Sequence, residues 1–246
     1  MLRPKAGVIA ALAACLIACY PQARPGRARI PIRVKQPLGS HHAGSRIVGY
    51  RIDPARSWLR VLVYRAGPLA NLGHDHVVSN RALRGWLRLG ESWTQSSFVI
   101  EVPVGDFVVD DEAERQALGG VFAAAVAPAD RRGTRAHMLG PFQLDAAHHP
   151  LIRLRSLAIF APSPRPAARV EVRVAGHRAV LDLPFTASAF AFSNPPAGIV
   201  ARTAFELRQT RLGITPYQVM LGALRVRDRV EVQMSLYAVR SGSAEN

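Results

Sequence analysis

From residue 47 onward, hydrophobic and polar positions alternate with a period of two in one segment after another. Residues 230–238 put every second side chain, from Val230 to Ala238, on one apolar face, and residues 169–174 alternate in the same way. This pattern is typical of antiparallel strands with one buried and one solvated face. We therefore expect an all-β fold of about eight to nine strands. The other strand candidates are 48–53, 57–65, 77–90, 98–103, 151–160, 181–185 and 202–208.

The strand pattern is interrupted at residues 111–148. Two stretches there, 111–118 and 128–139, indicate short helices, and the first has acidic residues in its first turn. Turn signals rich in Pro, Gly, Asn and Asp separate the strands on either side. One helical excursion within a run of strands favours a closed barrel with a plug or lid over a sandwich. We expect one domain over 47–240, an eight-stranded antiparallel barrel whose interior is filled or holds one small ligand.

The beginning of the chain has a different pattern. Two basic residues precede an uncharged stretch, 6–20, of 15 residues. It has the length of the apolar part of a secretory signal and is too short to span a bilayer. Residues 16–19, Leu-Ile-Ala-Cys, resemble a bacterial lipobox, whose signal is cut before a cysteine that is then lipidated. We expect export and lipidation at Cys19; Cys15 is a less well-placed alternative, and an ordinary signal with incidental cysteines is another.

Charge is unevenly distributed. The chain has 32 Lys and Arg against 17 Asp and Glu, a net charge of +15, yet residues 1–46 contain eight basic residues and no acidic one. Prolines and like charges keep residues 20–46 extended, which predicts a basic tether that spaces the domain or contacts anionic lipid head groups. Residues 241–246 are expected to be a disordered tail. The basic residues of the body are arginines on outward strand positions such as Arg169, Arg173, Arg202 and Arg208, so no nucleic-acid partner is expected.

The most polar cluster of the body is Gly73-His74-Asp75-His76. A His-x-His spacing on a strand directs both imidazoles to one face, which makes His74 and His76 a workable pair of metal ligands. The alternative, which we favour, is that Gly73 turns the chain and the histidines form hydrogen bonds at the barrel rim. A third ligand would have to come from residues that show no ligand spacing to this pair: His137, His148, His149 or His177.

An acidic run at Asp110, Asp111, Glu112 and Glu114 is the other candidate cluster. Its carboxylates would suit a cation, but such a run more often is a solvated loop that opens a helix, and this is what we expect. No catalytic residue is predicted. The chain lacks a nucleophile elbow, a phosphate loop and a dinucleotide fingerprint, and processing at Cys19 would leave no cysteine nucleophile.

The body of the chain, about residues 49–240, resembles the YceI-like family of exported bacterial proteins. Gly49–Pro54 is similar to the family's first strand, although Arg56-Ser57 stands where members commonly have a His-Ser pair. Residues 144–156 match its most characteristic stretch: an apolar residue, Asp, variable residues, Pro, and a strand that ends in Ser. These motifs are specific when taken together. Further similar segments are 138–139, 176–177, 180–185, 212–214 and 226–239.

The resemblance implies a lipocalin-like barrel in the periplasm or cell envelope that binds a polyisoprenoid-type lipid and catalyses no reaction. Burial of the ligand's chain, about 0.8 kcal/mol per CH₂ group, would drive binding, and its head group would meet His74, His76 or a nearby arginine at the rim. No cofactor is expected. The alternatives are a metal-binding protein or metal-dependent enzyme using His74 and His76, and a scaffold with a filled barrel. The expected interior side chains are Phe98, Ile100, Val102, Leu181, Leu183, Phe185, Phe205, Leu207, Val230, Val232, Met234 and Leu236.

Overall fold

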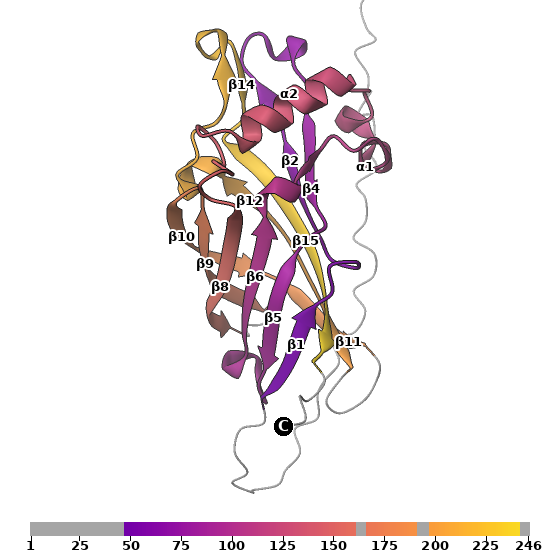
Figure 1. Cartoon of the computed structure of the whole chain (residues 1–246), viewed down its shortest axis with the longest axis vertical. Helices are drawn as coiled ribbons and strands as arrows, with labels where there is room; N and C mark the ends of the chain where they lie inside the picture. The colour runs from indigo at the N-terminus through magenta and orange to yellow at the C-terminus, as the bar shows by residue number, and fades with distance from the viewer. Residues whose placement is uncertain (1–46, 161–165, 191–196, 242–246) are drawn as a thin grey trace, which may run out of the picture. The chain divides into compact units, whose positions relative to one another are not determined.

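The computed structural model describes residues 47–160, 166–190 and 197–241 (Figure 1). The predicted signal, Cys19, the tether 20–46 and the tail 242–246 lie outside these residues. Neither of the two α-helices in the described part of the chain is long and apolar enough to cross a membrane.

Long antiparallel strands build the body of the fold (Figure 1). Each strand of the main path is hydrogen-bonded to the next. β15 (Arg229–Arg240) also pairs along its length with β12 (Gly198–Arg208), which in turn pairs with β11 (Thr186–Phe190). Phe185 alone separates β10 (His177–Pro184), at one end of the path, from β11, so the chain itself links that end to the branch formed by β12 and β11. With β10 and β11 taken as one bent strand, the circuit has the eight strands expected from the sequence, and the all-β barrel is confirmed. In order, the circuit contains β10 (His177–Pro184), β9 (Ala167–Val174), β8 (Leu151–Phe160), β6 (Ser97–Pro103), β5 (Arg84–Leu89), β1 (Val48–Ile52), β15 (Arg229–Arg240), β12 (Gly198–Arg208) and β11 (Thr186–Phe190).

Further strands extend the sheet beyond this circuit. Past the end of β1, β15 pairs instead with β2 (Trp58–Val63), which pairs with β4 (His76–Asn80), and β4 pairs with β7 (Val108–Val109). A separate three-stranded sheet consists of β13 (Gln218–Val219), β14 (Leu224–Val226) and β3 (Arg65–Ala66). Figure 1 places β14 at the same end of the barrel as the longer helix.

The single strand predicted over 77–90 is wrong. The structure has two strands there, β4 and β5, separated by residues 81–83. Asn80 makes the break, because its side-chain oxygen accepts a hydrogen bond of 2.9 Å from the backbone N–H of Ala82, and its amide donates one of 2.8 Å to the carbonyl of Pro103. An asparagine that bonds the backbone two residues ahead turns the chain.

Two helices form within the segment where the sequence predicts them. The first, α1 (Glu112–Leu118), begins after Asp111, whose carboxylate accepts a hydrogen bond of 3.0 Å from the backbone N–H of Glu114. The second, α2 (Pro128–Leu139), begins with a proline, whose fixed φ suits a first helical position. In Figure 1 α2 lies across one end of the barrel, and its Met138 and Leu139 pack against the core. Short 3₁₀ turns lie at η1 (Ala70–Leu72), η2 (Trp93–Gln95), η3 (Val104–Asp106), η4 (Gly120–Phe122), η5 (Gln209–Leu212) and η6 (Met220–Gly222).

The alternation in the sequence identifies the two faces of the barrel wall. Inward positions such as Ile100, Val102 and Val170 are buried in the core. Outward positions carry the arginines, and those at 169, 173, 202 and 208 are exposed, as expected. The wall is therefore apolar inside and basic outside.

Candidate functional site

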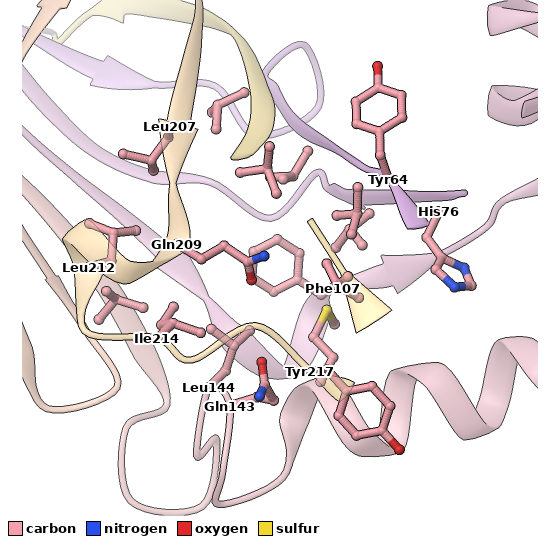
Figure 2. A pocket seen from close by; sticks show the side chains of 18 of the residues that line it. Tyr64, His76, Phe107, Gln143, Leu144, Leu207, Gln209, Leu212, Ile214 and Tyr217 are labelled. Atoms are coloured by element: carbon pink, nitrogen blue, oxygen red, sulfur yellow. The ribbon is translucent and has the colours of Figure 1, made fainter. Parts of the chain in front are cut away.

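The interior of the barrel is hollow at the end that α2 covers. A cavity of about 360 Å³ lies there (Figure 2), and side chains from α2, β2, β8, β12, β14 and β15 line it. This volume is on the scale of small-molecule sites, about 300–1,000 Å³. The lining is mostly aliphatic and aromatic; Figure 2 shows Leu207, Leu212 and Ile214 on one side of Phe107 and Tyr64 and His76 on the other.

A second, smaller cavity of about 80 Å³ lies elsewhere in the barrel, near η2. Leu154, Leu183 and Met234 line both cavities, so only these side chains and their neighbours separate the two spaces. A rotamer change in a long, flexible side chain such as Met234 could join them, because methionine adapts easily to irregular gaps.

The twelve side chains predicted to face the interior all border one of these cavities. That they bind a ligand stays a prediction. Those on the larger cavity are Val102, Leu181, Leu183, Phe205, Leu207, Val230, Val232 and Met234. The smaller cavity is bordered by Phe98, Ile100, Phe185 and Leu236, and again by Leu183 and Met234.

Sequence reasoning missed one wall of the larger cavity. Leu59, Val61 and Val63 line it from β2. The alternation there is weak, because Leu62 on the other face is also apolar and buried. Residues on three regular strands, β4, β8 and β9, were missed as well: Val78, Ile152, Leu154, Val172 and Val174. Others come from α2, from the loop after it and from the short strands near β14. Their positions depend on tertiary packing, and strands of two or three residues are too short to show a period. They include Thr134, His137, Met138, Gln143, Leu144, Tyr217, Val219, Leu224, Arg225 and Val226.

Polar side chains are a minority around the larger cavity, and they carry no negative charge. Among the described residues that line it, none is Asp or Glu, whereas Arg65, Arg225 and three histidines are present. Arg65 is partly neutralised by Asp75, whose carboxylate accepts a hydrogen bond of 2.8 Å from the Arg65 backbone and lies 3.8 Å from its guanidinium. The polar part of the lining therefore favours a neutral or anionic group over a cation.

His74 and His76 both border the cavity, but the strand geometry predicted for them is wrong. His74 lies in the loop before β4, and only His76 belongs to the strand. The ring centroids are 6.4 Å apart with the planes at 71°. His76 donates from Nδ1 to Asp110 Oδ2 at 2.7 Å, which is a hydrogen bond at the rim, as the favoured interpretation expected for this histidine.

Two of the residues considered as a third metal ligand have aromatic or hydrogen-bond partners of their own. The ring of His137 packs on Tyr217 at a centroid distance of 5.0 Å, and Nδ1 of His148 donates to Asp145 at 2.9 Å. Across residues 47–160, 166–190 and 197–241, no group of three or more His, Cys, Asp or Glu side chains is placed to hold a metal ion.

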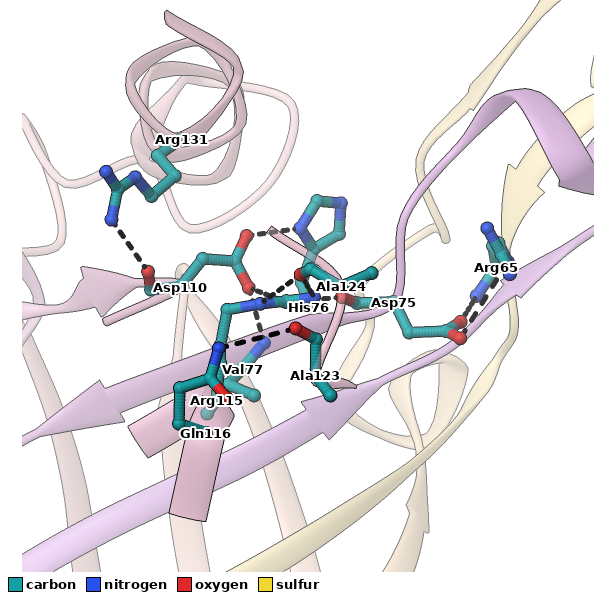
Figure 3. Close-up of polar contacts among 10 residues, drawn as sticks. All are labelled: Arg65, Asp75, His76, Val77, Asp110, Arg115, Gln116, Ala123, Ala124 and Arg131. Carbon is teal, nitrogen blue, oxygen red and sulfur yellow. Dashed lines mark hydrogen bonds and ion pairs between the residues drawn. The ribbon is translucent and has the colours of Figure 1, made fainter. Parts of the chain in front are cut away.

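Asp110 is the centre of a buried ionic network (Figure 3). Its side chain is fully buried and accepts from Arg115 Nη1 at 2.5 Å, from the backbone N–H of Val77 at 2.9 Å and from His76. Burial alone would raise the pKa of this carboxyl, but the hydrogen bonds from His76, Val77 and Arg115 outweigh it and lower the pKa. Arg115 also donates to the carbonyls of Asp75 at 2.7 Å and of Ala124 at 2.8 Å.

The prediction that the acidic run is a solvated loop is therefore wrong for two of its members. Asp110 and Glu114 are both buried. Glu114 is paired with Arg60 at 3.3 Å and with Arg81 at 3.1 Å. Arginines balance these two carboxylates, whereas Asp111, the N-cap of α1, and Glu112, exposed in its first turn, match the expected role.

The Asp110–His76 pair resembles the base and orienting group of a hydrolytic triad only in part. A triad also needs a nucleophile hydrogen-bonded to the second ring nitrogen. In the described part of the chain no hydroxyl group hydrogen-bonds His76, and the hydroxyl of Tyr64 donates instead to Glu231 at 2.7 Å. The pair fixes the imidazole at the cavity wall.

Comparison with known proteins gives structural likeness alone. No family model and no curated protein sequence matches the chain. The crystal structure of BcnA from Burkholderia cenocepacia superposes with a TM-score of 0.55 at 13% identity, covering 76% of this chain and 99% of BcnA. The YceI protein of Campylobacter jejuni superposes with a TM-score of 0.41 at 8% identity, covering 87% of this chain and 98% of that one. The likeness to BcnA, a YceI-like protein, shows that the chain has a YceI-like β-barrel fold.

Proposed function

We propose that this YceI-like barrel is a binding protein that holds an apolar, isoprenoid- or lipid-like ligand in its interior and catalyses no reaction. The observation that carries the proposal is the cavity of about 360 Å³ inside the barrel, walled mainly by hydrophobic side chains. A barrel that served only as a scaffold would gain stability by filling this space, since protein interiors are close-packed.

Burial of the ligand's hydrocarbon would supply the binding free energy, about 0.8 kcal/mol for each CH₂ group removed from water. The polar end of the ligand would lie at the rim, near His74, His76 and Arg225. Because the lining has no carboxylate among the described residues, a neutral or anionic head group suits this rim better than a cationic one.

A location in the cell envelope is the second part of the proposal. It rests on the sequence: the apolar stretch 6–20, the lipobox-like ending at Cys19 and the basic segment 20–46. A lipid anchor with a basic tether would hold the barrel near an anionic membrane, because polybasic segments add to the binding that one lipid anchor gives. We expect Cys19→Ser to release the protein into the soluble fraction; retention in the membrane would mean that Cys15 or an uncleaved signal holds it.

Native mass spectrometry of protein purified from its own host tests the binding function. We expect an additional lipid mass that survives desalting. An Ile214→Trp variant, which adds bulk at the cavity wall, should lose this mass. Leu157→Trp is the matched control, because Leu157 is exposed on the outside of β8 and its variant should keep the lipid.

Two outcomes would contradict the proposal. Stoichiometric zinc or copper that is lost in a His74→Ala/His76→Ala variant would favour the metal-binding alternative. Neither lipid nor metal, in a folded protein, would favour a scaffold.

A further inference from the structure

The turn η6 exposes two large apolar side chains at the tip of the hairpin formed by β13 and β14. Met220 is 64% exposed and Leu221 is fully exposed. Their backbones have φ of +51° and +55°, and that of Gly222 has +86°, so three successive residues are left-handed. Side chains as bulky as Met and Leu rarely adopt this conformation. Strain of this kind persists where the surrounding structure imposes it, and it is concentrated at functional sites.

A second segment lies against this turn. The backbone N–H of Leu69 donates to the carbonyl of Ala223 at 2.9 Å, and Gly67 approaches the same carbonyl so closely that a Cβ there would lie 2.4 Å from it. This second segment ends in η1, where Leu72 is 62% exposed. Leu72, Met220 and Leu221, from these adjoining segments, are called the apolar tip below.

The surroundings of the apolar tip are basic. Residues 65–74 and 209–227 contain no Asp or Glu. They contain four arginines and one histidine: Arg65, Arg211, Arg225, Arg227 and His74. The carboxylates that flank the two segments are engaged. Asp75 is buried and paired with Arg65. Asp228 accepts hydrogen bonds of 2.9 Å from the backbone and the hydroxyl of Thr210 and lies 3.9 Å from Arg208. An apolar projection carried by two segments that contain arginines and no carboxylate of their own is complementary to a bilayer with anionic head groups.

The same segments form part of the cavity wall. Tyr217 and Val219 precede the apolar tip, Leu224 and Arg225 follow it, and all four line the larger cavity. Figure 2 shows Tyr217 beside the cavity. The tip therefore lies at the end of the barrel where the cavity has its polar lining.

We propose that the apolar tip docks on an anionic lipid surface, with Met220 and Leu221 inserted at the boundary between head groups and acyl chains. Docking in this orientation turns the cavity end of the barrel toward the membrane. A second copy of the chain or another protein fits the tip less well, because three projecting side chains cannot bury the roughly 1,200 Å² or more of a stable protein interface. Insertion into a membrane needs only a few side chains. Docking of the tip on a membrane requires no particular ligand in the cavity.

Tryptophan fluorescence of the full chain tests the proposal. We expect the additional emission of a Leu221→Trp variant, relative to the unmodified chain with its three tryptophans, to shift to the blue on vesicles of phosphatidylglycerol and phosphatidylcholine. The shift should be lost on vesicles of phosphatidylcholine alone. Val180→Trp is the matched control, because Val180 is 43% exposed on β10 of the barrel wall, and its emission should not change.

The emission reports on the surroundings of position 221 alone. It therefore shows whether the tip is inserted even if the N-terminal segment also holds the chain at the vesicle. Unchanged Leu221→Trp emission on vesicles that carry bound protein would overturn the proposal. A blue shift without vesicles that grows with protein concentration would point to a second copy and would also overturn it. A Leu221→Asn variant checks folding, because asparagine tolerates a left-handed backbone; we expect it to unfold no more easily and to bind anionic vesicles at least about tenfold more weakly where the tip provides the attachment.

Discussion

Asp110 Oδ2 accepts a hydrogen bond of 2.7 Å from His76 Nδ1. Asp110 directly precedes the helical segment and His76 borders the cavity, so this contact links the helical segment to the cavity wall. The same carboxylate holds Arg115 of α1 through its other oxygen. One buried side chain therefore fixes both the position of α1 and the orientation of an imidazole that borders the cavity.

Replacing Asp110 with asparagine should destabilise the fold strongly. The substitution keeps the size of the side chain but leaves the buried guanidinium of Arg115 without its countercharge, a loss that costs about 3–5 kcal/mol in comparable buried pairs. Urea unfolding of both proteins measures it. Asp182→Asn, which removes the exposed partner of Arg169, is the control and should have a much smaller effect. Equal losses of unfolding free energy in the two variants would mean that the buried pair stabilises the fold no more than the exposed one.

The buried carboxylate should also make the protein sensitive to acid. The pKa of Asp110 is lower in the folded state than the value of about 3.9 in an unfolded chain. Its contribution to the free energy of unfolding is therefore complete above about pH 4 and is lost as the pH falls through the folded-state value. We expect urea unfolding at a series of pH values to show a steep loss below about pH 4 that is shallower in Asp110→Asn. Some dependence of the unfolding free energy on pH should remain in the variant, because the pKa values of Glu171, Asp182 and Asp228 are lowered too. The same dependence in both proteins would contradict the assignment to Asp110.

The sequence predicts the barrel wall well, because the relevant signal is local. The bounds of β8 and α2 agree with the expected 151–160 and 128–139, since alternation, the opening proline and the flanking turns all lie within a few residues. The inward positions follow from the same alternation. A period of two identifies which side chains share a face.

The sequence does not predict contacts that join distant segments. Asp110 is in an acidic run that looks solvated, and its burial depends on His76 and Val77, more than thirty residues earlier in the chain. The break after Asn80 depends on the carbonyl of Pro103, on a different strand. Whether the interior is hollow depends on how all the strands and α2 pack together, which no single segment shows.

Shortening a side chain that borders the cavity should lower the free energy of unfolding less than shortening a side chain in the packed core. Leu83 is completely buried in the core and does not line either cavity, whereas Leu183 borders both. We expect Leu83→Ala to cost about 2–5 kcal/mol, as in well-packed cores. Leu183→Ala should cost less, because part of its surface already lacks packing partners. Denaturant unfolding of ligand-free protein compares the two, and an equal or larger loss at Leu183 would show that the interior is packed in solution.

The tight turn between β9 and β10 contains a residue whose replacement should stabilise the fold. Ala175 and Gly176 connect the paired residues Val174 and His177, with φ of +47° and +76°. A two-residue hairpin turn with both residues left-handed prefers Asn-Gly, whereas an L-residue with a Cβ and no compensating side chain is strained there.

Ala175→Asn should therefore raise the free energy of unfolding by about 0.5–1 kcal/mol. Glycine at the same position should help less, since it also increases the entropy of the unfolded chain. Ala179→Asn is the control, because it places the same residue within β10, where asparagine is unfavourable in a strand. Thermal and urea unfolding of the three variants measure their order of stability. A loss of stability in Ala175→Asn would mean that the turn in solution does not have the left-handed backbone seen at Ala175.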